Sequence, residues 1–246
     1  SLISSLILMN ATPIWGLNLP GCYGKLPAPP LPKMIGRALF DLIRDYETID
    51  WYLNAAYVHR DAFVGTDHDE EEALGVKIRG CTETKGGHAA FASILWSGPA
   101  SADWKAEGVA YGNGPFPSTY ADFYGTLGKL PVDVLLLFGE NDTWCTPAVA
   151  KRMHTTLANR ELDTPAAAQR YISLLNAGHC PNHEAPTAVA KVVLPWISGE
   201  DRSTVPLITD DNKIIEPWGE IITREVSIKE SKNLGMMDKI VSTLAG

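Results

Sequence analysis

Residues 174–186, LLNAGHCPNHEAP, link an apolar β-prone run to an apolar run with helical spacing. The run before them, residues 171–175, is typical of a buried strand, and residues 188–197 favour a helix. The stretch therefore predicts an α/β fold in which His179 lies in a loop at the carboxyl end of a strand. Loops of this kind commonly hold the functional side chains of α/β proteins.

A second stretch upstream carries a complementary acid. Residues 132–138, VDVLLLF, predict a fully buried strand, and residues 139–144, GENDTW, predict the turn that follows it. Asp142 lies just beyond that strand and 179 − 142 = 37 residues before His179. The interval holds a predicted helix near residues 147–157 and the strand that leads to the histidine. The chain order is therefore acid first, then histidine.

This order is typical of one class of catalytic triad. In α/β-hydrolases the nucleophilic serine of a G-x-S-x-G turn comes first, then an aspartate or glutamate, then a histidine. The histidine takes the serine proton, and the carboxylate orients the imidazole and stabilises its charged form. Asp142 and His179 fit the last two roles. Glu140 is the alternative acid, because either carboxylate can perform this role chemically.

Other polar and aromatic residues near these loops have less specific interpretations. Asp133, at the start of the buried strand, favours a structural role, and His183 is expected to face solvent or to support the site as a polar neighbour. Cys180 borders His179, and such a cysteine is commonly a small buried residue. Trp15 and Trp144 both follow predicted strand ends. They favour packing, and they are also candidates for lining an apolar substrate pocket.

Composition limits the classes of protein. A chain of 246 residues with 45% hydrophobic and 20% charged residues can form one α/β domain with an insertion. Its net charge of −8 argues against nucleic acid as a partner, because nucleic acids select basic surfaces. The four cysteines are widely spaced without a C-x-x-C pair, which predicts reduced intracellular thiols and neither a zinc site nor a disulfide framework. No apolar run reaches the ~18 residues that span a bilayer, so no stable membrane insertion is expected.

The chain divides into four predicted parts. They are a core strand with its exit loop (residues 1–13), a helical lid insertion (14–128), a C-terminal core that carries the acid and the histidine (129–198), and a polar, weakly ordered extension (199–246). Helical spacing within the insertion predicts helices near residues 34–46, 47–58, 67–79, 88–96 and 118–127. Such a helical insertion between two buried strands is typical of a lid that shapes a pocket and excludes water. In the extension, residues 213–215 and 220–222 are short β-prone pieces, and the chain favours a helix near 236–244.

Four segments together carry a family resemblance. They are NATPIWG at residues 10–16, AAFASIL at 89–95, FGENDTW at 138–144, and AGHCP at 177–181 with Glu184 and Pro186 beyond it. In this order and spacing, residues 1 to about 198 resemble the C-terminal part of a plant or algal α/β-hydrolase of the pheophytinase-like group. The fold that the resemblance implies is a mostly parallel α/β-hydrolase sheet with an inserted helical lid.

The resemblance implies a serine esterase without metal or organic cofactor. Its substrate would be a small apolar ester, in the pheophytinase case the phytol ester of magnesium-free chlorophyll, and its compartment the chloroplast. Asp142 would be the triad acid and His179 the general base. No serine of this chain has a glycine two residues before and two residues after it. We therefore expect the chain to be an N-terminally incomplete fragment, with the nucleophile upstream of Ser1.

Two other functions remain open at this point. A non-catalytic α/β-hydrolase scaffold could bind an apolar ligand under its lid. Epoxide hydrolases and haloalkane dehalogenases share the fold and use an aspartate nucleophile at the same turn. The residue at that turn distinguishes the three alternatives.

Overall fold

The computed structural model describes residues 3–11, 38, 40–42, 44–58, 73–84, 86–87, 124–125, 127–160, 167–208, 213–218 and 222–231. By its internal contacts the chain forms two compact units. The first comprises Ser1–Ala11, Asn54–Ala62 and Leu127–Gly246, and the second Thr12–Leu53 and Phe63–Thr126. The first unit contains the sheet and, within the described residues, both predicted catalytic side chains.

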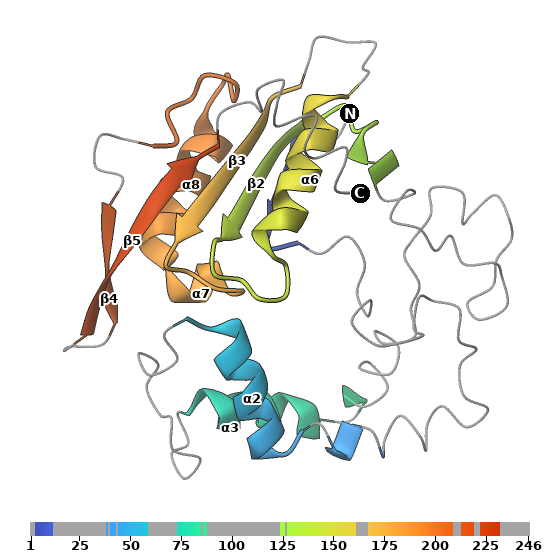
Figure 1. Ribbon diagram of the computed structural model, residues 1–246, viewed down its shortest axis with the longest axis vertical. Coiled ribbons are helices and arrows are strands. Elements are labelled where there is room, and N and C mark those ends of the chain that lie inside the picture. Colours follow the sequence, from blue (N-terminus) through green and yellow to red (C-terminus); the bar gives the residue numbers. More distant parts are fainter. Residues whose placement is uncertain are drawn as a thin grey trace, which may run out of the picture. The chain divides into compact units, whose positions relative to one another are not determined.

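A five-stranded mixed sheet is the centre of the first unit (Figure 1). Its order is β1-β2-β3-β5-β4, formed by β1 (Ser5–Met9), β2 (Asp133–Gly139), β3 (Gln169–Leu175), β4 (Lys213–Trp218) and β5 (Ile222–Glu230). The strands β1, β2 and β3 run parallel, whereas β5 pairs antiparallel with both β3 and β4. The α/β class and the strands predicted around residues 132–138 and 171–175 are thus observed.

Helices cover both faces of the parallel strands. The helix α6 (Pro147–Ala158) packs against β2 and β3, and α8 (Pro186–Ser198) packs against β4 and β5 (Figure 1). Alternate residues of a strand point to opposite faces. Leu135 and Leu137 of β2 join the core cluster under Trp196 of α8, whereas Tyr171 of β3 contacts His154 of α6. Burial on both faces explains why β2 is a continuous apolar run.

Proline marks the beginning of three described helices in this unit. α6, the short α7 (Pro181–Glu184) and α8 all have proline in their first turn. Proline is favoured there because its fixed φ suits a helix and its missing N–H would have had no helical partner. The helices predicted near residues 147–157 and 188–197 are therefore observed with small shifts of their bounds.

The structure differs from the sequence interpretation at the C-terminal end. Residues from 199 onward were expected to form a weakly ordered extension, but β4 and β5 form a hairpin that extends the sheet. Val226 and Ile228 of β5 and Ile214 of β4 lie in the same apolar core as Trp196. The apolar pieces of this hairpin are short, and they gain a partner only through β3, which lies far away in sequence. Residues 236–244 lie outside the described residues.

The described part of the second unit is helical. It contains most of α2 (Tyr46–Ala56) and all of α3 (Leu74–Glu83), and the guanidinium of Arg79 lies 4.7 Å from the ring centre of Tyr46. Residues 54–62, placed by sequence in the lid insertion, belong instead to the sheet unit. The helix expected at 88–96 lies outside the described residues, as does Trp15, and those expected at 34–46, 67–79 and 118–127 are only partly described.

No described helix of this chain has the length and apolarity needed to cross a bilayer.

Candidate active site

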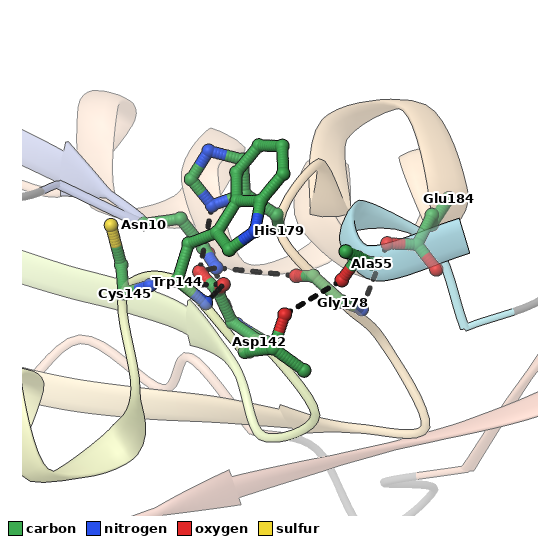
Figure 2. Close-up of polar contacts among 10 residues, drawn as sticks. Asn10, Ala55, Asp142, Trp144, Cys145, Gly178, His179 and Glu184 are labelled. Atoms are coloured by element: carbon green, nitrogen blue, oxygen red, sulfur yellow. Dashed lines mark hydrogen bonds and ion pairs between the residues drawn. The ribbon is translucent and has the colours of Figure 1, made fainter. Parts of the chain in front are cut away.

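The carboxyl ends of β1, β2 and β3 bring three polar side chains together. Asn10 follows β1, Asp142 lies three residues after β2, and His179 lies four residues after β3. Because these strands are parallel, their carboxyl ends share one edge of the sheet, which is where α/β proteins place their sites. Figure 2 shows Asp142 and Asn10 pointing toward His179 from the segments that follow their separate strands.

The acid and the histidine form a direct hydrogen bond. His179 Nδ1 lies 2.9 Å from Asp142 Oδ2, and the side chain of Asp142 is fully buried whereas that of His179 is 26% exposed. Glu140, the alternative acid, is exposed, and its backbone N–H bonds to the carbonyl of Leu174. The structure therefore places Asp142, and not Glu140, against the histidine.

Four donors surround the Asp142 carboxylate. Its Oδ1 accepts the backbone N–H groups of Trp144 at 2.7 Å and Cys145 at 3.0 Å, and its Oδ2 accepts Nδ2 of Asn10 at 2.6 Å besides the bond from His179. Burial by itself raises the pKa of this carboxyl group. The hydrogen bonds from His179 and Asn10 outweigh burial and lower the pKa below its ordinary value of 3.8. Asp142 is thus a fixed anion at neutral pH.

Asn10 holds the acid and the histidine loop together. Besides Asp142, its amide donates to the carbonyl of Gly178 at 3.2 Å, and its Oδ1 accepts the backbone N–H of Gly139 at 3.0 Å. Its φ of 40° lies in the left-handed region, which asparagine tolerates better than most residues. Sequence reasoning gave Asn10 no role. The available signal was an asparagine directly after a predicted strand.

The loop that carries His179 is held by a backbone hydrogen bond and by hydrogen bonds to one buried acid. The backbone N–H of His179 donates to the carbonyl of Ala56 at 2.7 Å. Glu184, which is fully buried, accepts the N–H of Gly178 at 2.8 Å through one oxygen and that of Val58 at 2.9 Å through the other. These bonds tie the loop to the end of α2 and the residues that follow it.

A glycine is needed at position 178 because the backbone packs so closely there. A Cβ atom at Gly178 would collide with the carbonyl oxygen of Ala56 and would lie 2.8 Å from Oε1 of Glu184. The absence of a side chain at Gly178 therefore permits the loop contacts that position His179. Sequence reasoning noted this glycine and Glu184 only as parts of a motif.

The environment of His179 favours its charged form. Burial by itself lowers the pKa of the imidazole, but the hydrogen bond to Asp142 and a contact with Cys145 raise it to about 9. The neighbouring carboxylate thus stabilises the imidazolium. This is the electrostatic role that a triad acid performs when its histidine takes up a proton.

Trp144 packs against the histidine. The two ring centres lie 4.7 Å apart at an interplanar angle of 61°, and Trp144 is 37% exposed (Figure 2). The tryptophan thus forms an apolar surface beside His179. Its role in lining a substrate pocket stays a prediction.

The remaining candidates have identifiable partners. Asp133 accepts the N–H of Ala168 at 2.7 Å and pairs with Arg202 at 3.2 Å, which is a structural role at the other end of β2. His183 is exposed and its Nδ1 lies 3.1 Å from the hydroxyl of Tyr57. Cys180 is half-buried, and burial raises the pKa of its thiol.

Cys145, like Asn10, is a residue of this site to which sequence reasoning assigned no role. It is buried, and its sulfur lies within 4.8 Å of a ring nitrogen of His179 and of a carboxylate oxygen of Asp142. Thiolate, imidazole and carboxylate are all metal ligands. Three described side chains here could therefore bind a metal ion, although the wide spacing of the cysteines predicted no such site.

Chemically, the Asp142–His179 pair is suited to proton transfer. With a pKa raised to about 9, the imidazole becomes neutral as the pH rises toward that value. In the neutral ring Nδ1–H donates a hydrogen bond to Asp142, and Nε2 is left as a proton acceptor. A carboxylate that orients the ring and stabilises its cation is the arrangement of a general base.

Comparison with known proteins gives little similarity. No protein-family model matches the sequence, and no curated protein is significantly similar to it. Among solved structures, the chain is similar to a membrane phospholipase A described as a bacterial virulence factor. The two share 17% sequence identity with a TM-score of 0.43, over 79% of this chain and 49% of the other. The chain thus spans about half of that protein, and a likeness of this degree does not establish a shared fold.

Proposed function

We propose that the chain is the acid- and base-bearing part of an α/β-hydrolase that cleaves carboxylic esters. Asp142 is the triad acid and His179 the general base. The observation that supports this proposal is the 2.9 Å hydrogen bond between a fully buried carboxylate and a partly exposed imidazole at the carboxyl edge of parallel strands. The acid-then-histidine chain order agrees with the α/β-hydrolase arrangement.

In this reaction His179 removes the proton of a serine hydroxyl as the oxygen attacks the ester carbonyl. Asp142 stabilises the imidazolium that forms. The imidazolium then gives its proton to the departing alcohol, and water hydrolyses the acyl-enzyme through the same histidine. Because the chain contains no G-x-S-x-G sequence, the proposal assigns the nucleophile to residues outside these 246.

The substrate that we propose is a small apolar ester, and a pheophytinase-like phytol ester in the chloroplast is its most specific form. The exposed indole of Trp144 beside His179 supports an apolar group near the reacting bond. The four pheophytinase-like segments support the narrower substrate and the compartment. The net charge of −8 agrees with a partner other than nucleic acid.

The test is ester hydrolysis by the gene product that carries the proposed upstream nucleophile. His179→Ala and Asp142→Asn should each lower kcat/KM by about 10²- to 10⁴-fold, the usual contribution of general acid–base catalysis. The matched controls are His183→Ala, an exposed histidine four residues away, and Glu140→Gln, an exposed acid two residues from Asp142. Both controls should hydrolyse the ester at close to the wild-type rate.

The possible outcomes distinguish the esterase from the alternative functions. Wild-type turnover in His179→Ala would show that the histidine is not the base. Binding of apolar esters with no hydrolysis by any form would favour the non-catalytic scaffold. Hydrolysis of epoxides or haloalkanes in place of esters would indicate an aspartate nucleophile. Pheophytin cleaved no better than short-chain esters would contradict the pheophytinase-like substrate and leave the esterase proposal standing.

A further inference from the structure

Cys145, Asp142 and His179 form a compact set of three different donors. A thiol sulfur, a carboxylate oxygen and an imidazole nitrogen all lie within 4.8 Å of one another, and no second group of this kind occurs among the described residues. Asp142 and Cys145 are buried, and the side chain of His179 is 26% exposed. We propose that these three side chains bind a divalent transition metal ion of the Zn²⁺ type.

The donor set selects the class of metal. Mg²⁺ and Ca²⁺ prefer sites made of oxygen ligands, whereas Zn²⁺ is bound by thiolate, imidazole and carboxylate together. Three protein ligands with a fourth position left for water is a common zinc arrangement. The mixture of sulfur, nitrogen and oxygen at this site therefore favours Zn²⁺ over the hard cations.

The geometry requires only local adjustment. Zinc bonds of about 2.0–2.2 Å to nitrogen and oxygen and about 2.3 Å to sulfur place tetrahedral ligands about 3.3–3.6 Å apart. His179 Nδ1 and Asp142 Oδ2 are 2.9 Å apart, so this pair would widen by a few tenths of an ångström. The ligand atoms lie within 4.8 Å of one another, so the sulfur of Cys145 would have to approach the other two by at most about 1 Å. The metal would then replace the proton shared by the carboxylate and the ring.

Charge also favours a divalent cation here. A carboxylate and a thiolate together carry two negative charges, which one Zn²⁺ neutralises beside a neutral imidazole. The net charge of −8 on the chain attracts cations generally. A buried pair of anions without a cation would be costly, which is a further reason for a divalent cation at this site.

Metal binding would prevent His179 from acting as a base. Coordination through Nδ1 leaves the single imidazole proton on Nε2, so the ring can no longer accept a proton there. Zn²⁺ should therefore inhibit hydrolysis by competing with the catalytic use of His179. This inhibitory consequence rests on the proposed hydrolase function, whereas the metal site itself does not.

The test uses Co²⁺ as a spectroscopic probe of the metal-free chain, kept reduced by a phosphine. One equivalent of Co²⁺ should produce a near-ultraviolet thiolate-to-cobalt charge-transfer band, and Zn²⁺ should abolish it by displacement. Cys145→Ser and His179→Ala should both lose the band. Each should weaken Zn²⁺ binding at least about tenfold, because even outer-shell partners of metal ligands contribute about 10- to 100-fold. The controls Cys180→Ser and Cys81→Ser should keep the band.

A band that persists in Cys145→Ser, disappears in either control, or never forms in the wild type would overturn the proposal. Because Cys145 is buried, circular dichroism must show that its variant folds, and His179→Ala decides the matter if that variant does not. Hydrolysis that needs His179 without any cobalt band would reject only the metal site. A His179-dependent band with hydrolysis unaffected by His179→Ala would reject only the proposed base.

Discussion

At the scale of single residues, the site depends on how one carboxylate is held. Asp142 receives hydrogen bonds from two backbone groups and two side chains, so both of its oxygens are oriented. A fixed carboxylate holds the imidazole in one orientation and one tautomer. The residue that completes this arrangement, Asn10, comes from a strand 132 residues away in sequence.

Asn10→Gly tests the role of that amide without adding backbone strain, since glycine accepts a φ of 40°. We expect a loss of about 1–3 kcal/mol in the free energy of unfolding, because the buried N–H of Gly139 loses its acceptor. The pKa of Asp142 should also rise, since its bond from Asn10 lowers it. Urea unfolding and carboxyl NMR titration measure these two effects.

The control is Asn176→Gly, which replaces another asparagine of positive φ whose side chain makes an exposed bond to the carbonyl of Glu225. Its loss of stability should be smaller. An Asn10→Gly variant with the stability and the Asp142 pKa of the wild type would show that the amide does not position the acid.

At the scale of elements, the loop between β3 and α7 is held by hydrogen bonds to a residue of α7. Glu184 at the end of α7 accepts one N–H from the histidine loop and another from the segment after α2. One buried carboxylate therefore fixes two chain segments that are far apart in sequence. We expect the position of His179 to depend on both.

Glu184→Gln should loosen this loop. The amide offers one acceptor oxygen in place of two, so either the buried N–H of Gly178 or the partly buried N–H of Val58 loses its partner. The cost is up to about 1–3 kcal/mol. We expect the pKa of His179 to fall from about 9 toward 6.5 as its bond to Asp142 weakens. Thermal unfolding and imidazole NMR titration check the two effects, with the exposed Glu200→Gln as control. An unchanged histidine pKa in the stable variant would mean that Glu184 does not position the loop.

The hairpin β4–β5 is the element whose contribution to stability is most readily measured. Ile228 is 2% exposed and packs in the core cluster, whereas its neighbour Lys229 is exposed. Ile228→Ala should reduce the free energy of unfolding by about 2–5 kcal/mol through lost burial and the cavity left behind. Lys229→Ala should change it little. Equal urea midpoints for the two variants would show that the hairpin does not belong to the folded sheet.

At the scale of the whole molecule, the acid–histidine pair makes stability depend on pH. The pKa of His179 is raised from 6.5 to about 9 in the folded protein, so its bond to Asp142 stabilises the fold fully below pH 6.5. That contribution should decline as the pH rises from 6.5 to about 9. The pKa of Asp142 is lowered, so the same bond also weakens as the pH falls below 3.8.

The measurement is the difference in unfolding free energy between the wild type and His179→Gln, followed across pH in the presence of a metal chelator. We expect the difference to be largest between about pH 4 and 6.5 and to shrink toward pH 9. His183→Gln alters an exposed histidine. Its difference in unfolding free energy from the wild type should not change with pH over the alkaline part of this range. If the wild type became more stable relative to His179→Gln as the pH rose above 6.5, the raised pKa of His179 would be contradicted.

Much of the local structure followed from the sequence alone. The apolar run at residues 132–138 predicted β2, and the helical spacing at 147–157 and 188–197 predicted α6 and α8. This was possible because the faces of an element that are buried determine which of its residues are apolar. Asp142 and His179 were predicted as partners because each directly follows such a strand. Parallel strands bring their carboxyl ends together.

The tertiary structure alone decided what surrounds that pair. Asn10, Glu184 and Cys145 act through contacts with residues distant in sequence or on another loop, which no local pattern records. The hairpin β4–β5 was expected to be weakly ordered because its own apolar content is small. It is ordered because β3 offers an unpaired edge and α8 an apolar face. Periodicity thus predicted the elements, and position after the strand ends predicted the acid and the histidine. Long-range packing decided how these two side chains are held.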